Sequence, residues 1–204
     1  MIITKIEPVK LRYYPQKPLR DGLARIPSRD VFLLKIETDE EIYGIGEGFA
    51  LGCLDSVAAY TLECLAPLLI GSNPLEITRL WNRIYQQTFR FGKRGIGIAA
   101  LSAVDIALWD ILGKKAGLPV CSLLGKAHDC IYPYASAGYY APGKTIEDLR
   151  KEAAGYKAQG FQMMLDLGDT EDQIAEKTGF SKSTIKHRLN IAKLDQDVLK
   201  EKEQ

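Results

Sequence analysis

The sequence predicts an α+β fold, in which a small antiparallel sheet comes first along the chain and helices follow it. Two observations predict this fold. Three stretches with the alternation of β-strands lie within residues 1–50, and three stretches with helical spacing of apolar residues follow between residues 54 and 116. A length of 204 residues, 46% of them apolar, with a net charge of +1, allows one large globular domain or two modest ones.

Three strands are expected before residue 51. Apolar and polar residues alternate over residues 2–14, and a loop rich in proline, arginine and glycine follows over residues 15–28. Residues 30–38 and 42–50 have the pattern of two further strands. The acidic turn at residues 39–41 lies between them and predicts a hairpin.

Three glycines, Gly44, Gly46 and Gly48, alternate with other residues in the last of these strands. A phosphate-binding loop is the alternative explanation of such a cluster. The GxGxxG spacing is absent, however, and the run lies inside a strand pattern. We therefore expect hairpin geometry at these glycines.

The first two helices are expected over residues 54–69 and 75–88. The second of them begins behind Asn73-Pro74, which places Pro74 near the first helical turn, where a missing N–H costs nothing. Both segments carry apolar residues on one side, as helices that cover a sheet require.

The third helix begins before residue 100 and has unusual small residues on one face. Alanines recur there at helical spacing, so that another backbone can approach that face closely. These residues are Ala100, Ala103 and Ala107. Lys114 and Lys115 suit the negative end of the helix dipole, Gly117 is placed to cap the helix, and Pro119 ends it. Asp110 and Lys114 have the spacing of an i,i+4 ion pair.

The ordered combination of residues in this segment is more specific than a buried helix alone. The residues that carry the pattern are Ala100, Ser102, Ala103, Val104, Asp105, Ala107, Leu108, Asp110, Ile111, Gly113, Lys114, Pro119, Val120, Leu123, Leu124 and Gly125. Position by position, the pattern resembles the signature of the mandelate racemase and muconate lactonizing enzyme branch of the enolase superfamily. The resemblance implies that residues 1–125 are the capping domain of an enzyme that removes the α-proton of a carboxylate with the help of Mg²⁺.

The resemblance continues beyond the cap, into the first elements of a (β/α) barrel. Residues 126–164 contain a strand-like run and then a helix, with Thr145 as N-cap and Asp148 three residues on, an acidic variant of the capping box. Residues 160–164 match the start of the next barrel strand. The resemblance also implies a small carboxylate substrate. Barrel-strand edges left open by truncation favour a homo-oligomer, and the four cysteines, without CxxC pairing or a dense framework, indicate reduced thiols and a cytoplasmic location.

The same resemblance nominates residues that contact substrate. In the family, two loops of the cap lie over the active site, and they correspond here to residues 20–26 and 49–53. Leu23, Ile26 and Phe49 are the candidates for substrate contact. Packing in the core or on the surface is the alternative for each of them.

The resemblance stops at Met164. A Lys-x-Lys pair is expected next in the family, where one lysine moves the α-proton, but the matching positions read Leu165-Asp166-Leu167. Neither leucine can carry a proton, and the family's Mg²⁺ ligands come from later strands. We therefore expect no catalytic residue, no metal ligand and no cofactor in this chain. It has the features of a truncated or chimeric member that is inactive alone.

Residues 165–204 have a different pattern, that of two short helices around a tight turn, and they resemble the helix-turn-helix of ParB-type partition proteins. The stretch from residue 181 to residue 193 contains four basic residues and no acidic one. The residues placed to meet DNA are Ser181, Lys182, Thr184, Lys186, His187 and Arg188. The alternative function is thus a DNA-binding regulatory protein with weak, salt-sensitive affinity, and an amphipathic helix with a solvated basic face remains the simpler explanation.

Other classes of protein receive little support. Acids and bases nearly cancel, so total charge does not argue for nucleic-acid or membrane binding, and no membrane partner is expected. The four cysteines lack the CxxC spacing of a metal site. A further interpretation is that the join near Met164 arose by recombination, assembly or design of the sequence.

Overall fold

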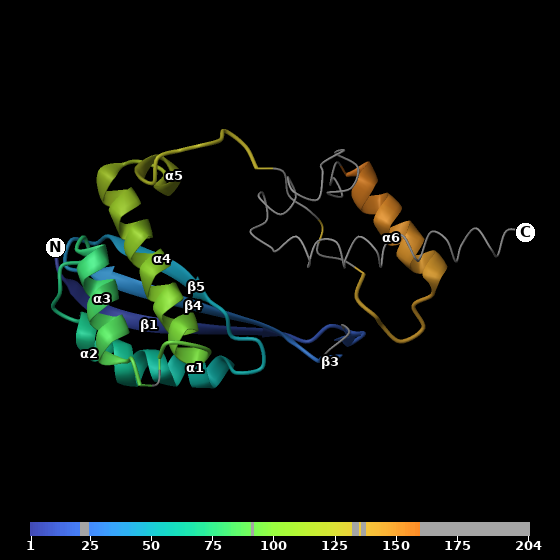
Figure 1. The fold of residues 1–204 in the computed structure, drawn as a ribbon, viewed down its shortest axis with the longest axis horizontal. Helices are drawn as coiled ribbons and strands as arrows, with labels where there is room; N and C mark the ends of the chain where they lie inside the picture. Colours follow the sequence, from blue (N-terminus) through green and yellow to red (C-terminus); the bar gives the residue numbers. More distant parts are fainter. Residues whose placement is uncertain (21–24, 91, 132–134, 136–137, 160–204) are drawn as a thin grey trace, which may run out of the picture. The chain divides into compact units, whose positions relative to one another are not determined.

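A computed structural model describes residues 1–20, 25–90, 92–131, 135 and 138–159 (Figure 1). The chain divides into two compact units. The first consists of residues 1–129 together with 139–142, and the second of residues 130–138 together with 143–204. The first unit has the α+β fold that the sequence predicts.

A three-stranded antiparallel sheet forms the base of the first unit. Strand β1 spans Ile3–Tyr13, β4 spans Arg29–Thr38 and β5 spans Tyr43–Gly48, in the order β1-β4-β5. The predicted hairpin joins β4 to β5, and the amide of Thr38 donates a hydrogen bond to the carbonyl of Ile42 at 3.1 Å. All three predicted strands are thereby confirmed.

The segment predicted as a plain loop contains a short second hairpin. Strand β2 (Leu19–Arg20) pairs with β3 (Arg25–Ile26) in antiparallel fashion. Two residues on each side are too few for an alternation of apolar and polar residues to reveal them. The sequence therefore gave no signal for this hairpin.

The first predicted helix is present, but its middle turn is wider than an α-helix. Helix α1 (Leu54–Tyr60) continues into the π-helical η1 (Thr61–Leu65) and then into α2 (Ala66–Leu69). Pro67 lies in the first turn of α2 and has no N–H to donate four residues back. A π-helical turn is one way for a helix to accommodate such a break.

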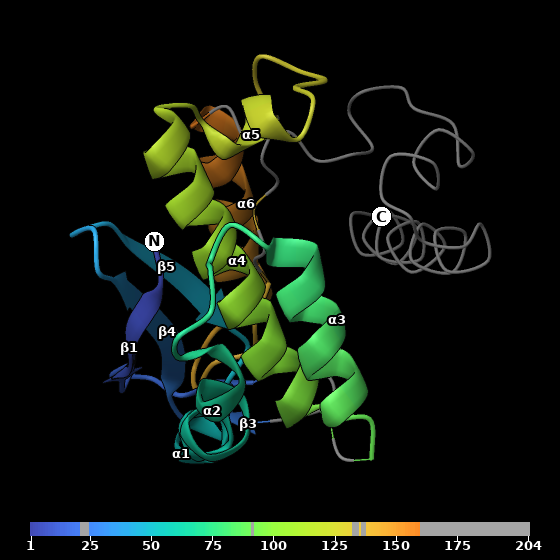
Figure 2. The ribbon, with the colours of Figure 1, turned by 90° about the vertical axis from the view of Figure 1, so that its left-hand side faces the viewer.

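Three more helices complete the first unit: α3 (Ile77–Gln87), α4 (Ile96–Ala116) and the short α5 (Val120–Leu123). Helices α1 to α4 lie on one side of the sheet (Figure 2). The predicted end of α4 is confirmed, because Gly117 adopts the left-handed conformation at φ 65° and the amide of Leu118 bonds the carbonyl of Gly113 at 3.0 Å.

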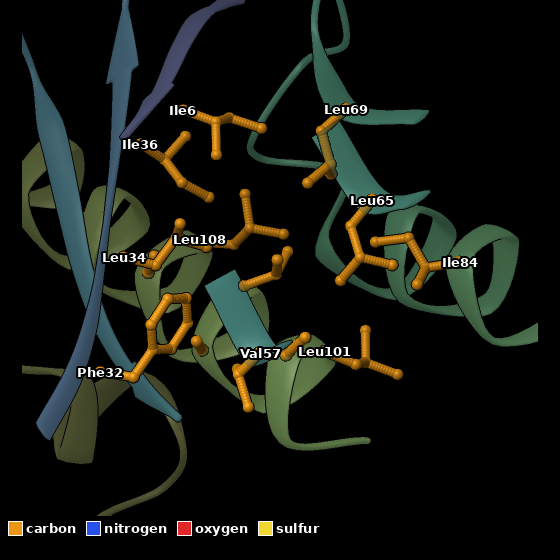
Figure 3. Packing of buried hydrophobic residues seen from close by; sticks show 14 of the residues in the cluster. Ile6, Phe32, Leu34, Ile36, Val57, Leu65, Leu69, Ile84, Leu101 and Leu108 are labelled. Atoms are coloured by element: carbon orange, nitrogen blue, oxygen red, sulfur yellow. The ribbon is translucent and has the colours of Figure 1, made fainter. Parts of the chain in front are cut away.

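The hydrophobic core lies between the sheet and these helices. Phe32, Leu34 and Ile36 of β4 are fully buried against side chains of the helices, among them Val57 and Leu108 (Figure 3). Within the described part of the chain, α4 is the one helix long and apolar enough to cross a membrane. A helix buried in the core of a globular protein is as apolar as a membrane span, and α4 lies in this core.

Strand β5 packs against α4 through backbone rather than side chains. A Cβ atom placed on Gly46 would lie 1.9 Å from the carbonyl oxygen of Ala103, and one placed on Gly44 would lie 2.0 Å from that of Ala107. A Cβ atom placed on Gly48 would lie 2.6 Å from the carbonyl oxygen of Ala99. The alanine face of the helix therefore does receive another backbone, as predicted, and the glycines of the hairpin provide it.

The free edge of β5 is also covered by α4. The amide of Ile45 donates to Asp110 Oδ2 at 2.8 Å, and Lys114 Nζ donates to the carbonyl of Tyr43 at 2.8 Å. Asp110 and Lys114 form the predicted i,i+4 ion pair at 2.7 Å. Two polar backbone groups of this edge strand are thus occupied by side chains of α4.

In the second unit, helix α6 spans Ile146–Ala158. Its predicted capping box is confirmed. The amide of Asp148 donates to Thr145 Oγ1 at 3.2 Å, and the amide of Thr145 donates to Asp148 Oδ2 at 2.8 Å. Lys144 pairs with Glu152 on the same helix. Local signals thus determine this helix without help from the core.

Candidate substrate-capping loops

Two loops lie at the end of the sheet where β4 begins. The first, residues 20–26, precedes β4, and the second, residues 49–53, follows β5. A single carboxylate, that of Asp30, connects them. The Asp30 side chain is fully buried, whereas its partner Arg12 is about one-third exposed, at 36%. Arg12 donates two hydrogen bonds to it, from Nε at 2.7 Å and from Nη2 at 2.9 Å. The two residues are direct cross-strand partners on β1 and β4. A paired fork of this kind fixes geometry more strongly than a single contact does.

The remaining contacts of Asp30 reach both loops. Ser28 Oγ, at the end of the first loop, lies 3.0 Å from Asp30 Oδ1. The amide of Gly52, within the second loop, donates to Asp30 Oδ2 at 3.2 Å, and Gly52 has a positive φ of 77° that favours glycine. Asp30 therefore holds the base of the first loop and the middle of the second in a fixed relation.

The electrostatic state of Asp30 follows from these contacts. The hydrogen bond from Arg12 holds the pKa of the Asp30 carboxyl below its ordinary value of 3.8, and the bonds from Ser28 and Gly52 act in the same direction. Burial acts in the opposite direction and does not prevail. The carboxylate is thus ionised at neutral pH and accepts all of these hydrogen bonds.

A second ion pair fixes the far end of the second loop. Lys10 Nζ on β1 lies 2.6 Å from Asp55 Oδ1 at the start of α1. The hydrogen bond from Lys10 lowers the pKa of the Asp55 carboxyl. Both side chains are largely exposed, so this pair orients the loop rather than stabilising the fold by much.

The candidates for substrate contact occupy different environments. Ile26 belongs to β3 of the small hairpin and is buried, with 5% of its surface exposed. Phe49 is 73% exposed at the start of the second loop. Leu23 lies outside the described residues. The positions of Leu165 and Leu167, and the predicted DNA-contacting set from Ser181 to Arg188, lie outside them as well.

The described residues do not form a site for the Mg²⁺ of the family. No three His, Cys, Asp or Glu side chains gather there in a way that could hold a metal ion. Among the described acids, Asp30 and Asp55 lie at the ends of these loops, and each is paired with a cation of the protein itself. No chemical step is therefore assigned to a metal in this part of the chain.

Sequence reasoning missed Asp30 and Arg12. Each lies in a predicted strand, but their pairing depends on the register between β1 and β4, which the 15-residue connection over residues 14–28 does not specify. The available signal was weak: a charged residue of each sign stands on the side of its strand that otherwise carries the core, since Arg12 shares that side with Lys10 and Asp30 shares it with Phe32.

Comparison with known proteins agrees with this geometry. Residues 7–125 match the family described as mandelate racemase / muconate lactonizing enzyme, N-terminal domain. Arabinonate dehydratase of Saccharolobus solfataricus is 41% identical over 166 residues, which make up 79% of this chain and 44% of that protein. A D-mannonate dehydratase of Sphingomonas sp. is 42% identical over 138 residues, 67% of this chain and 33% of that protein.

Solved structures show the same relation. The crystal structure of the 3,6-anhydro-D-galactonate cycloisomerase from Zobellia galactanivorans is 33% identical with a TM-score of 0.64, over 79% of this chain and 41% of that one. A member of the enolase superfamily from Polaromonas sp. JS666 is 32% identical with a TM-score of 0.68. The chain thus spans less than half the length of these relatives. On the match over residues 7–125, it belongs to the mandelate racemase/muconate lactonizing enzyme family.

Proposed function

We propose that residues 1–125 act as the cap of an acid-sugar dehydratase or isomerase, an enzyme whose barrel removes the α-proton of a carboxylate with Mg²⁺. The observation that carries the proposal is the buried Asp30, which joins both capping loops at one end of the sheet. The cap contributes substrate contact and exclusion of water, which strengthen every charge interaction at the reacting centre. A carboxylate substrate, a homo-oligomeric assembly and a cytoplasmic location belong to this proposal.

A hybrid enzyme tests the cap directly. Residues 1–125 replace the corresponding segment of the Saccharolobus solfataricus arabinonate dehydratase, and the control is the same enzyme cut and rejoined at that junction with its own cap. We expect the hybrid to retain turnover of an aldonate, with a changed KM between arabinonate and mannonate because the capping loops differ. A folded hybrid that turns over neither acid at any concentration, beside an active control, would overturn the proposal.

The 204-residue polypeptide is proposed to have no turnover of its own. The positions that match the family's catalytic lysines hold Leu165 and Leu167, which cannot carry a proton. We expect no exchange of the α-proton of arabinonate or mannonate in D₂O with Mg²⁺, measured by proton NMR over a day, while the Saccharolobus enzyme exchanges it readily. Exchange that depends on Mg²⁺ and on this protein would show that the proposal of inactivity is wrong.

DNA binding by the C-terminal segment is a second candidate function, favoured by one observation. Residues 181–193 carry four basic side chains and no acidic one, and they follow the spacing of a helix-turn-helix. Contacts of basic side chains with DNA phosphates do not depend on the base sequence, and they weaken steeply as the salt concentration rises.

A fluorescence-anisotropy titration with duplex DNA tests this candidate. We expect a Kd of about 10 μM at low salt, of the order typical for non-specific binding, which weakens at least about tenfold at moderate salt. Lys186→Ala with Arg188→Ala should abolish it, whereas Lys10→Ala in the cap should not. The absence of binding even at low salt would exclude DNA as the partner. Equal effects of the tail and cap variants would mean that residues 181–193 do not carry the binding.

A further inference from the structure

Three side chains form a row on one face of the small hairpin in the first capping loop. Arg20 of β2 and Arg25 of β3 are direct cross-strand partners. On the other side of β2, Tyr140 forms an antiparallel bridge with Arg20, with backbone hydrogen bonds of 2.9 Å and 2.7 Å between them. Residues directly opposite each other in antiparallel pairs point to the same face. The order across that face is therefore Arg25, Arg20, Tyr140.

The charge of this row is unbalanced. Within the described part of the chain, neither Arg20 nor Arg25 takes part in an ion pair, although Arg12 and several lysines do. Two like charges directly opposite each other on a ladder destabilise the pairing. An anion placed between the two guanidinium groups would reverse that penalty, because arginine forks suit the oxygens of carboxylate and phosphate groups.

A hollow lies beside the row. It has a volume of about 500 Å³, within the range of sites for small molecules, and both arginines and Tyr140 line it. Pro18, Leu19 and Pro142 supply apolar walls. The hydroxyl of Tyr140, a residue 63% exposed, offers a further donor at the same hollow.

We propose that Arg20 and Arg25 bind the second acidic group of an acid sugar, a carboxylate or phosphate at the end remote from the reacting carbon. The inference rests on the proposed function, since it names the substrate class for that same cap. A substrate with an acidic group at each end would be held by the barrel at one end and by these arginines at the other. Next to this pair in the hairpin, Ile26 lies opposite Leu19 and is buried.

The test measures binding to the whole 204-residue protein by NMR, independently of turnover. The probes are D-glucarate, 6-phosphogluconate and D-gluconate, with neutral sorbitol as control. We expect the anionic probes to shift the amide signals of Arg20, Arg25 and Tyr140 with saturation, and sorbitol to leave them unchanged. Binding of the phosphate-bearing probe alone would assign the site to phosphate, and equal binding of glucarate would assign it to carboxylate; both support the site.

Matched variants decide whether the two arginines are responsible. Arg20→Gln and Arg25→Gln should each weaken binding about tenfold, because each removes one charged fork. Arg94→Gln, a change at an exposed arginine ahead of α4, should leave binding unchanged. Undisturbed affinity in both Arg20→Gln and Arg25→Gln, with unchanged melting temperatures, would overturn the proposal. Because the hybrid-enzyme test uses arabinonate and mannonate, which have a single acidic group, failure here leaves the proposed cap function standing.

Discussion

A Gly46→Val variant is expected to lose at least about 3 kcal/mol of unfolding free energy, the upper end of the usual cost of overpacking. The reason is the position of the added atoms. A Cβ at residue 46 would lie 1.9 Å from the carbonyl oxygen of Ala103 and 2.8 Å from the amide of Ala107, and both are backbone atoms of α4 that no rotamer change can move. The strand must separate from the helix, and the core between them opens.

Glu47→Val is the matched control. It introduces the same side chain one residue along the same strand, on the opposite, exposed face, and should change stability by no more than about 0.5 kcal/mol. Urea denaturation followed by the fluorescence of Trp81 and Trp109 measures both. Similar losses in the two variants would mean that β5 and α4 are not in backbone contact.

Asp30→Ala is expected to cost about 2 kcal/mol, through the hydrogen-bonding groups that it leaves without an acceptor. Ser28, Gly52 and Arg12 all direct donors to this carboxylate. We expect the second capping loop to lose its order first, which hydrogen exchange of the Gly52 amide reports as faster exchange. The control is Asp55→Ala in the exposed pair with Lys10, which should change stability far less. Unchanged protection at Gly52 would contradict the role assigned to Asp30.

The contribution of Asp30 should depend on pH in a defined direction. Because the folded pKa of this carboxyl lies below 3.8, its stabilisation is fully present above about pH 5 and is lost as the pH falls through the lowered folded pKa. The difference in unfolding free energy between the natural chain and Asp30→Asn should therefore be largest near neutrality and shrink in acid. Glu37, Glu40 and Asp55 also have lowered pKa values, but they titrate in both proteins and cancel in the difference. A difference that is constant with pH would contradict this assignment.

The sequence predicted most of the fold because its signals were local. The acidic turn at residues 39–41, the Gly117 cap of α4 and the Thr145 capping box each depend on a few neighbouring residues, and the structure contains all three. The β2–β3 hairpin and the π-helical turn η1 were missed for the complementary reason. Each is too short for a periodic pattern of apolar residues to repeat often enough to be detected.

The candidate site was harder to predict, since it depends on contacts between distant parts of the chain. Family resemblance pointed to the two loops, but Asp30 and Arg12 became visible only with the register of β1 against β4. Ile26 lies in the first of these loops with a buried side chain, and its contact with substrate stays a prediction. For Leu23, and for the set from Ser181 to Arg188, the predictions stand as they were made.

The contact of glycine with alanine between β5 and α4 also acts as a register mark. A slide of β5 by one residue would bring Ile45 or Glu47 against the carbonyl of Ala103, where not even a Cβ atom fits, so only the observed alignment is compatible with close approach. Phe49 and Gly52 follow this strand. The contact between the backbones of β5 and α4 therefore sets their position along the helix to within a single residue, almost without side chains. Changes in the loop itself can then alter which ligand is met without altering where the loop begins.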